Sequence, residues 1–297
     1  MTKLSGIINV NKPMGFTSHD VVAKIRKILG IKQVGHTGTL DPIATGVLPV
    51  CIGKATKTIQ YLDSSKAYRA YLKLGVRTNT FDTEGEILEQ NLVNLDVEQI
   101  KSYLNDFRGE IKQKPPMFSA VHYKGKRLYE YARKNIEIDD IPERTITVKS
   151  IELVEVQEIE TPNPVAVIDV DCSSGTYIRS IINDLGNKLG YGACMEGLIR
   201  TRACGLKISD SYTIDKIAEL VKYNELDGLI INPLDVIELE KIKINDFQLD
   251  KITKGQSIDA PSDISFNGLK IALTFDNKLA AIAEVKENKI YPVNVFI

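Results

Sequence analysis

The sequence predicts an α/β protein with a small β-rich part at its C-terminal end, and three observations support this. The 297 residues are 43% hydrophobic and 26% charged, a globular composition long enough for one large or two unequal domains. Segments with helical periodicity alternate with short apolar strands up to about residue 237. From about residue 238 the chain changes to short β-type segments separated by turns.

Bulk composition excludes several classes of protein. The sequence has no N-terminal hydrophobic signal region and no apolar run of about 18 or more residues, so we expect neither export nor a membrane span. The four cysteines show no C-x-x-C spacing and there are three histidines in all, so we expect no zinc site and a reducing, cytoplasmic location. The net charge of −1 does not by itself support nucleic-acid binding.

The first elements are a strand and an amphipathic helix. Residues 6–10 form a short apolar strand, and the Pro and Gly of residues 11–15 mark a turn after it. Thr17 or Ser18 then caps a helix whose apolar residues recur at helical spacing, and Gly30 ends it. We expect this helix to pack on a sheet.

Residues 35–46 have three glycines, three threonines and no periodicity, which predicts a loop that holds a single acid, Asp41. Pro42 restricts Asp41 to extended geometry and so stiffens its backbone. An Asx-type turn would explain the pattern without chemistry. However, residues 1–60 carry eight Lys or Arg and only two acids, and a lone carboxylate in a basic segment is either paired or reactive.

Residues 47–52 are predicted to form a buried strand, and residues 54–62 a short helix. This junction does not match the phosphate-binding pattern G-x-x-x-x-G-K-[ST]. Gly53-Lys54 is followed by Ala55 instead of Ser or Thr, and Leu48 occupies the position of the first glycine. Residues 67–74 then read as a strand, residues 82–85 as a turn before another strand, and Asp96 as the cap of a helix that runs to Phe107.

Residues 101–135 form a second basic segment, with nine Lys or Arg against three acids. Its cations alternate with aromatic residues, the combination needed to bind an RNA backbone and unstacked bases. A solvated hairpin and helix with ordinary aromatic anchoring is the alternative. The pattern alone leaves both open.

Residues 145–172 contain two strands around a Pro-rich turn, and a helix with an apolar stripe from Ile178 to Leu189 follows. Arg179 lies on the flank of this stripe in the first helical turn, where a cation opposes the helix dipole by roughly 0.3–1 kcal/mol. Something nearby must compensate, or Arg179 is exposed and pairs with Asp184 or solvent. A strand around Leu198, a helix at residues 213–222 and the C-terminal β segments complete the chain.

These motifs closely resemble the TruB family of bacterial tRNA pseudouridine synthases, over about residues 5–205. The resemblance rests on six stretches: Asn11-Lys12-Pro13, residues 35–49, Lys66-Ala67-Tyr68-Arg69, residues 117–120, residues 124–133 and Gly175-Thr176-Tyr177-Ile178-Arg179. Gly197 to Arg200 continues it. The C-terminal part resembles the small PUA-like domain of the family by position and β pattern.

The resemblance implies that the chain isomerises uridine 55 in the T loop of tRNA to pseudouridine without a metal or cofactor. Asp41 would be the nucleophile, and Arg179 would favour its ionised form. Tyr68 would stack on the flipped base and accept a proton, while Tyr177 and Leu198 would form the pocket wall.

Further residues are implied to bind RNA. His36 would fill the vacated stack, the alternative being a solvated loop histidine. Lys12 matches a lysine near the pocket, the alternative being a solvated lysine at a strand end. The basic segment matches an insertion that closes over the T stem-loop, and its expected RNA contacts are Lys112, Lys114, Lys124, Lys126, Arg127 and Arg133.

The resemblance also implies a mixed, largely antiparallel sheet of the pseudouridine-synthase type in a catalytic domain of residues 1–237. A thumb-like insertion would occupy about residues 110–143, and a PUA-like domain residues 238–297. We expect a monomer whose partner is tRNA. Two alternatives remain: a non-catalytic RNA-binding or RNA-folding protein, and a guide-RNA-dependent synthase acting on ribosomal RNA. A hydrolase with paired carboxylates is disfavoured, because the loop holds no second acid.

Overall fold

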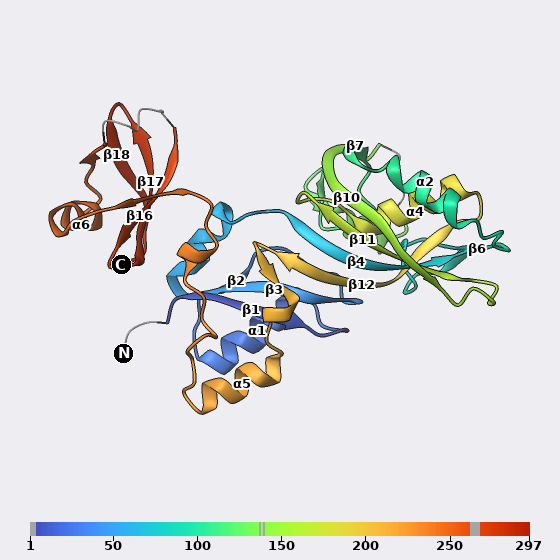
Figure 1. Cartoon of the computed structure of the whole chain (residues 1–297), viewed down its shortest axis with the longest axis horizontal. Coiled ribbons are helices and arrows are strands. Elements are labelled where there is room, and N and C mark those ends of the chain that lie inside the picture. Colours follow the sequence, from blue (N-terminus) through green and yellow to red (C-terminus); the bar gives the residue numbers. More distant parts are fainter. Residues whose placement is uncertain (1–3, 137, 139, 262–267) are drawn as a thin grey trace. The chain divides into compact units, whose positions relative to one another are not determined.

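The computed structural model describes residues 4–136, 138, 140–261 and 268–297 (Figure 1). The chain divides into two compact units built from segments that are distant in sequence. Unit 1 takes its residues from 1–42, 47–63 and 204–297, and unit 2 from 43–46 and 64–203.

The N-terminal part of unit 1 contains two strands, a helix and a 3₁₀ helix, and a third strand, β3, is shared with unit 2. Their bounds are β1 Gly6–Lys12, α1 Ser18–Leu29, β2 Val34–His36, β3 Ala44–Ile52 and η1 Gly53–Tyr61. Within unit 1, β3 pairs antiparallel with β2. The predicted helix at residues 54–62 is a 3₁₀ helix. The predicted loop is shorter than expected, because His36 ends β2 and Ala44 begins β3.

Helix α1 begins and ends as its sequence predicts. The Thr17 hydroxyl accepts a hydrogen bond from the Asp20 N–H, and the Asp20 carboxylate accepts one from the Thr17 N–H. The Thr17 hydroxyl also donates to the Asp20 carboxylate at 2.6 Å, and this bond together with that from the Thr17 N–H holds the pKa of Asp20 below its usual value. Gly30 ends the helix in the left-handed conformation, with φ of 64°. The buried apolar face of α1 packs in a core cluster with residues of β1 and β3.

Unit 2 is built on long antiparallel strands. The strands and helices are β4 Lys66–Leu74, β5 Val76–Thr78, β6 Ile87–Gln90, α2 Val97–Asn105, β7 Gly109–Gln113, β8 His122–Tyr123, β9 Lys126–Arg127, α3 Leu128–Ala132, β10 Arg144–Gln157, β11 Val165–Cys172, α4 Ile178–Leu189 and β12 Ala193–Ala203. Their sheet has the order β12-β4-β11-β10-β7, and every neighbouring pair is antiparallel. Helix α2 packs on β10, α4 packs on β12, and the two helices contact each other.

The start of β3 makes this sheet mixed. Residues 44–46 pair in parallel with β12, so that Gly46 stands opposite Arg200. Gly46 has φ of 99°, and a Cβ built on it would lie 2.4 Å from the carbonyl oxygen of Arg200. Only glycine permits this approach of the two backbones. The predicted mixed, largely antiparallel sheet is confirmed.

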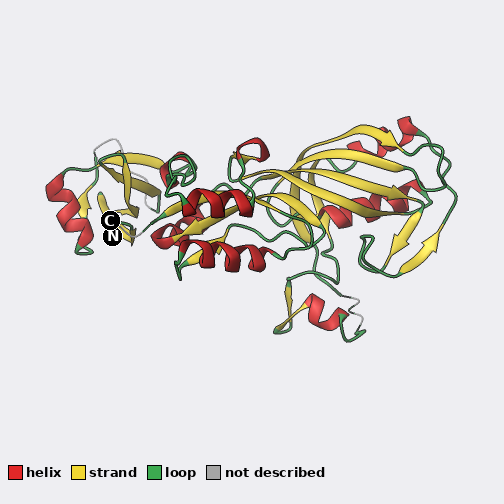
Figure 2. Ribbon diagram, turned by 90° about the horizontal axis from the view of Figure 1, so that it is seen from below, coloured by secondary structure: helices red, strands yellow, loops and turns green. Residues whose placement is uncertain are grey.

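The insertion between β7 and β10 holds the β8–β9 hairpin and α3. Figure 2 shows this short helix and its hairpin set apart from the sheet strands of unit 2. The Glu130 carboxylate accepts a hydrogen bond from the Arg127 N–H and so helps to start α3.

The C-terminal part of unit 1 is rich in β structure, as predicted. It comprises β13 Leu206–Lys207, η2 Ile208–Asp210, α5 Ile214–Lys222, η3 Pro233–Asp235, β14 Glu240–Lys243, α6 Asp246–Thr253, β15 Ile258–Asp259, β16 Lys270–Phe275, β17 Lys278–Lys286 and β18 Lys289–Val295. Five of these strands form a sheet of order β14-β16-β17-β18-β15 around its own apolar cluster. Helix α6 was not predicted. Among the described residues, no helix is long and apolar enough to cross a membrane.

Candidate active site

Asp41 lies half-buried in a loop of unit 1 whose backbone is fixed on both sides of it. Before it, the Ser18 hydroxyl accepts a hydrogen bond from the Leu40 N–H at 2.8 Å and donates one to the Leu40 carbonyl at 3.3 Å. After it, the Pro42 carbonyl accepts hydrogen bonds from the Gly15 N–H at 2.9 Å and from the Lys12 ammonium group at 3.3 Å. These contacts add to the stiffness that Pro42 itself confers.

Lys12, the last residue of β1, is fully buried, so the solvated lysine considered from the sequence is wrong. Its Nζ donates to the carbonyls of Pro13 at 3.0 Å, Phe16 at 2.5 Å and Pro42 at 3.3 Å. A buried ammonium group is tolerated only where acceptors replace its water. Lys12 therefore ties the turn after β1 to the loop that carries Asp41.

His36 is half-buried at the end of β2, at the start of the Asp41 loop, so it is not a freely solvated loop histidine. Its ring meets that of His19, in the first turn of α1, edge to face with centroids 5.4 Å apart. This is a preferred geometry for aromatic pairs. The contact orients the His36 ring.

Arg179 lies in the first turn of α4 in unit 2 and is only 5% exposed. Its Nη1 lies 3.1 Å from the Thr80 carbonyl and 3.4 Å from the Asp82 carboxylate, and its Nη2 donates to the Phe118 carbonyl at 3.0 Å. The alternative of an exposed arginine paired with Asp184 or solvent is therefore wrong.

Asp82 supplies the compensation that a cation in a first helical turn requires. Its carboxylate is buried beside Arg179 and also accepts a hydrogen bond from the Thr80 hydroxyl at 2.6 Å. The sequence predicted the turn at residues 82–85 but not this pairing, because no periodicity shows that Asp82 faces inward. A buried pair of this kind fixes geometry, since removing one partner leaves an uncompensated charge.

Tyr177 directly precedes α4, and one buried side chain holds its backbone. The Tyr177 N–H donates to Gln113 Oε1 at 2.8 Å, and Gln113 Nε2 donates to the Tyr177 carbonyl at 3.0 Å. The Ser180 hydroxyl donates to the Lys114 carbonyl at 3.2 Å. The end of β7 thus anchors the helical turn that carries Arg179.

Tyr68 and Leu198 lie on one face of neighbouring strands in unit 2. Tyr68 stands opposite Arg200, and Leu198 opposite Ala70, so the two are diagonal neighbours across β4 and β12. Such neighbours are within reach of aromatic side chains. Both are 7% exposed, so their side chains are almost entirely covered.

The predicted pocket residues therefore fall into two groups. Asp41, Lys12 and His36 belong to unit 1, whereas Tyr68, Tyr177, Arg179 and Leu198 belong to unit 2. The sequence did not indicate which residues hold these pocket residues in place, chiefly Ser18, Asp82 and Gln113. Their partners lie 22, 97 and 64 residues away, so no local spacing could have identified them.

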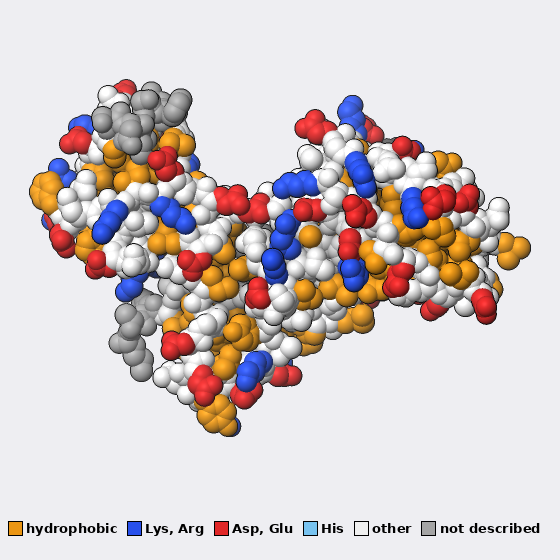
Figure 3. All heavy atoms as spheres, viewed as in Figure 1, with side chains coloured by type: hydrophobic (Ala, Val, Ile, Leu, Met, Phe, Trp, Pro, Cys, Tyr) orange, Lys and Arg blue, Asp and Glu red, His pale blue; other side chains and the backbone are white. Residues whose placement is uncertain are grey.

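The six basic side chains predicted to bind RNA are all exposed. Two of them lie over aromatic rings: Lys124 Nζ is 5.1 Å from the centroid of Tyr123, and the Arg133 guanidinium 5.2 Å from that of Tyr129. On the face that Figure 3 shows, lysine and arginine side chains are interspersed with acids, so a basic surface has to be local.

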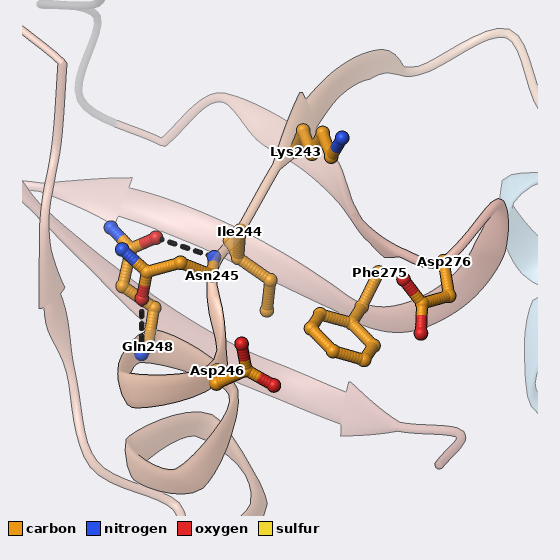
Figure 4. Close-up of a pocket in the computed structure, with 7 residues that line it drawn as sticks. All are labelled: Lys243, Ile244, Asn245, Asp246, Gln248, Phe275 and Asp276. Carbon is orange, nitrogen blue, oxygen red and sulfur yellow. Dashed lines mark hydrogen bonds between the residues drawn. The ribbon is translucent and has the colours of Figure 1, made fainter.

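A separate hollow of about 610 Å³ lies at the start of α6 (Figure 4). It contains none of the predicted site residues. Its two carboxylates oppose the binding of a phosphate. The lining residues are Lys243, Ile244, Asn245, Asp246, Gln248, Phe275 and Asp276.

The model of the TruB family pseudouridylate synthase N-terminal domain matches residues 26–178. The chain belongs to this family. Relatives agree: tRNA pseudouridine synthase B of Gloeothece citriformis is 47% identical over 85% of this chain and 81% of its own length. The Streptococcus gordonii protein of the same name is 39% identical over 99% of this chain and 100% of its own length.

Solved structures extend the similarity to nearly the whole chain. A chain in an H/ACA RNP bound to a substrate RNA containing 2'-deoxyuridine has a TM-score of 0.73 at 27% identity, covering 98% of this chain and 85% of that one. A chain in a Cbf5-Nop10-Gar1 complex has a TM-score of 0.72 at 30% identity, covering 98% and 84%. The protein is therefore a pseudouridine synthase, an isomerase.

Proposed function

We propose that the chain converts uridine 55 in the T loop of tRNA to pseudouridine, with Asp41 as the nucleophile. The observation that carries the tRNA substrate is the full-length match to the Streptococcus gordonii protein, which is named as a tRNA pseudouridine synthase. The role of Asp41 as nucleophile is supported by its half-buried position on a loop that hydrogen bonds hold at Leu40 and Pro42.

The reaction breaks the N1–C1′ bond of the nucleotide and forms a C5–C1′ bond. N1 gains a proton, and the hydrogen on C5 leaves as a proton, so atoms and charges balance. A carboxylate nucleophile divides this exchange into two easier steps. Asp41 is that nucleophile in our proposal, and the buried guanidinium of Arg179 favours its ionised form.

A uridine in a folded loop must be extruded before it reacts, at a cost of a few kcal/mol. Tyr68 stacks on the extruded base and accepts a proton during product formation, while Tyr177 and Leu198 complete the wall that retains uracil as it rotates. His36 fills the vacated stack. The adjacency of Tyr68 and Leu198 supports this division of roles.

The exposed cations of the insertion bind the tRNA backbone, so affinity falls as salt rises. They are Lys112, Lys114, Lys124, Lys126, Arg127 and Arg133. The enzyme acts as a monomer in the cytoplasm, where tRNA is its partner.

We also propose that residues 1–237 form the catalytic domain, with the insertion at about residues 110–143, and that residues 238–297 form a PUA-like domain. The separate apolar cluster within the five-stranded sheet supports the second part.

The test is tritium release from a tRNA transcript that contains 5-³H-uridine, because forming the C5–C1′ bond expels that hydrogen. We expect release by the wild type and by the surface control Asp250→Asn, and none by Asp41→Asn, which is nearly isosteric. All three should bind the transcript equally in a filter assay.

Two outcomes would contradict the proposal. Loss of tRNA binding in a folded Asp41→Asn variant would count against the nucleophile assignment. No release by a folded wild type that binds the transcript would favour the guide-dependent or non-catalytic alternatives.

A further inference from the structure

Gln113 is a buried polar residue whose side-chain amide binds the backbone of a single residue, Tyr177, through both its oxygen and its nitrogen. It is 4% exposed, its Oε1 accepts from the Tyr177 N–H at 2.8 Å, and its Nε2 donates to the Tyr177 carbonyl at 3.0 Å. An amide combines an acceptor with a donor on one planar group. A carboxylate of the same shape could accept from the N–H but would face the carbonyl oxygen with negative charge.

This clamp determines how α4 begins. Tyr177 occupies the N-cap position, where its own side chain makes no capping hydrogen bond. Helix starts depend on such bonds to fix their first turn. Gln113 instead fixes the Tyr177 backbone from outside the helix, two residues before Arg179.

Gln113 is also the residue at which the chain leaves the sheet for the insertion. It ends β7, and its register partner is Arg144, the first residue of β10. The two following contacts go to the same helical turn: the Lys114 carbonyl accepts from the Ser180 hydroxyl, and the Phe118 carbonyl accepts from Arg179 Nη2. Residues 113–118 therefore join the base of the insertion to residues 177–180.

We propose that Gln113 is a positioning residue for pseudouridine formation: from the base of the insertion, it holds Tyr177 and Arg179 in their reactive arrangement. This inference rests on the proposed function of those two residues and of the insertion. Gln113 acts through the α4 turn, so its loss slows the chemical step and leaves RNA affinity unchanged.

The first experiment compares Gln113→Glu with Gln157→Glu, which adds the same charge at an exposed position of β10. At saturating tRNA, we expect the single-turnover rate of Gln113→Glu to fall about 10- to 100-fold, the effect of a small displacement of reacting groups. Its dissociation constant for tRNA should equal that of Gln157→Glu. A normal rate with weakened binding would overturn the proposal.

The second experiment needs neither RNA nor activity. In Gln113→Met, which keeps the side-chain length without the amide, hydrogen exchange at the Tyr177 N–H should become faster than in the wild type. Unchanged exchange in this folded variant would overturn the clamp. A wild type that forms no pseudouridine in tRNA would instead overturn the proposed function.

Discussion

Lys12 and Arg179 are buried cations that bind main-chain carbonyls of loops. Lys12 reaches three carbonyls around the turn after β1, and Arg179 reaches those of Thr80 and Phe118. Each cation thus fixes backbone segments that have no regular secondary structure to hold them. In the proposed reaction, these segments carry or flank the reacting groups.

Lys12→Met tests this role for the ammonium group. The substitution removes the ammonium donor from the carbonyls of Pro13, Phe16 and Pro42, so we expect the free energy of unfolding to fall by about 2–4 kcal/mol. Turnover should also fall, because the Pro42 carbonyl beside Asp41 loses the ammonium contact. Urea denaturation and tritium release measure the two effects.

Lys24→Met is the matched control, since Lys24 is exposed on α1. It should change neither quantity measurably. Equal denaturation midpoints for Lys12→Met and Lys24→Met would show that the buried ammonium group does not hold the loop.

The sequence identified the chemical groups of the site better than their supports. Asp41 could be singled out because it is a lone acid in a basic loop. Arg179 was placed correctly in a first helical turn, but its partner Asp82 was missed. Such pairs depend on tertiary packing between distant segments, which one sequence does not show.

Among the elements, β3 and β12 approach more closely than side chains allow. Gly46→Ala adds a Cβ that would meet the Arg200 backbone, at a φ that alanine adopts with strain. We expect it to lower the free energy of unfolding by about 2–5 kcal/mol, combining backbone strain with overpacking. Denaturant titration measures this difference.

Gly190→Ala separates the two causes. Gly190 ends α4 with φ of 84°, but a Cβ there would meet nothing within 4 Å. Its cost should therefore be backbone strain alone, about 1–2 kcal/mol. If both variants lose the same stability, contact with Arg200 makes no contribution.

The sequence predicted elements well where local chemistry controls them. Thr17 and Gly30 bound α1 because capping and left-handed glycine act within one turn. Helix α6 was missed although Asn245 and Gln248 form a capping box at its start. Its Phe247 is exposed, so the apolar residues of this short helix do not mark one buried face.

For the whole molecule, the reactivity of the four cysteines reports on the unfolding of each unit separately. All four are buried: Cys51 and Cys204 lie in unit 1, and Cys172 and Cys194 in unit 2. Burial raises the pKa of Cys51 to about 12 and the pKa values of Cys172 and Cys194 to about 11. Below these values the thiols are neutral and poor nucleophiles.

We therefore expect the native protein to resist thiol-specific labelling at mildly alkaline pH. In a urea series analysed by mass spectrometry, Cys51 and Cys204 should become reactive at one midpoint, because they share one apolar cluster. Cys172 and Cys194 should become reactive together as unit 2 unfolds. Rapid labelling of any of them in the absence of urea would contradict their burial.

For the whole molecule, the sequence predicted that the C-terminal part is rich in β structure, but it did not predict how the chain divides into two units. The change to β segments near residue 238 is visible in the sequence, and the structure contains that sheet. The grouping of residues 204–297 with the N-terminal segments depends on contacts such as the Ile7–Ile231 and Leu62–Ile237 bridges. No local pattern encodes such long-range pairs.

The chain leaves the sheet at Gln113 and re-enters it at Arg144, and these two residues stand opposite each other in adjacent strands. A short hairpin turn could join such neighbours without changing the register of any other strand. The part of the insertion beyond Phe118 is therefore modular: evolution could lengthen, shorten or replace it while the catalytic sheet and the contacts of residues 113–118 with α4 stayed the same. Selection on substrate range and selection on chemistry would then act on largely separate stretches of the gene.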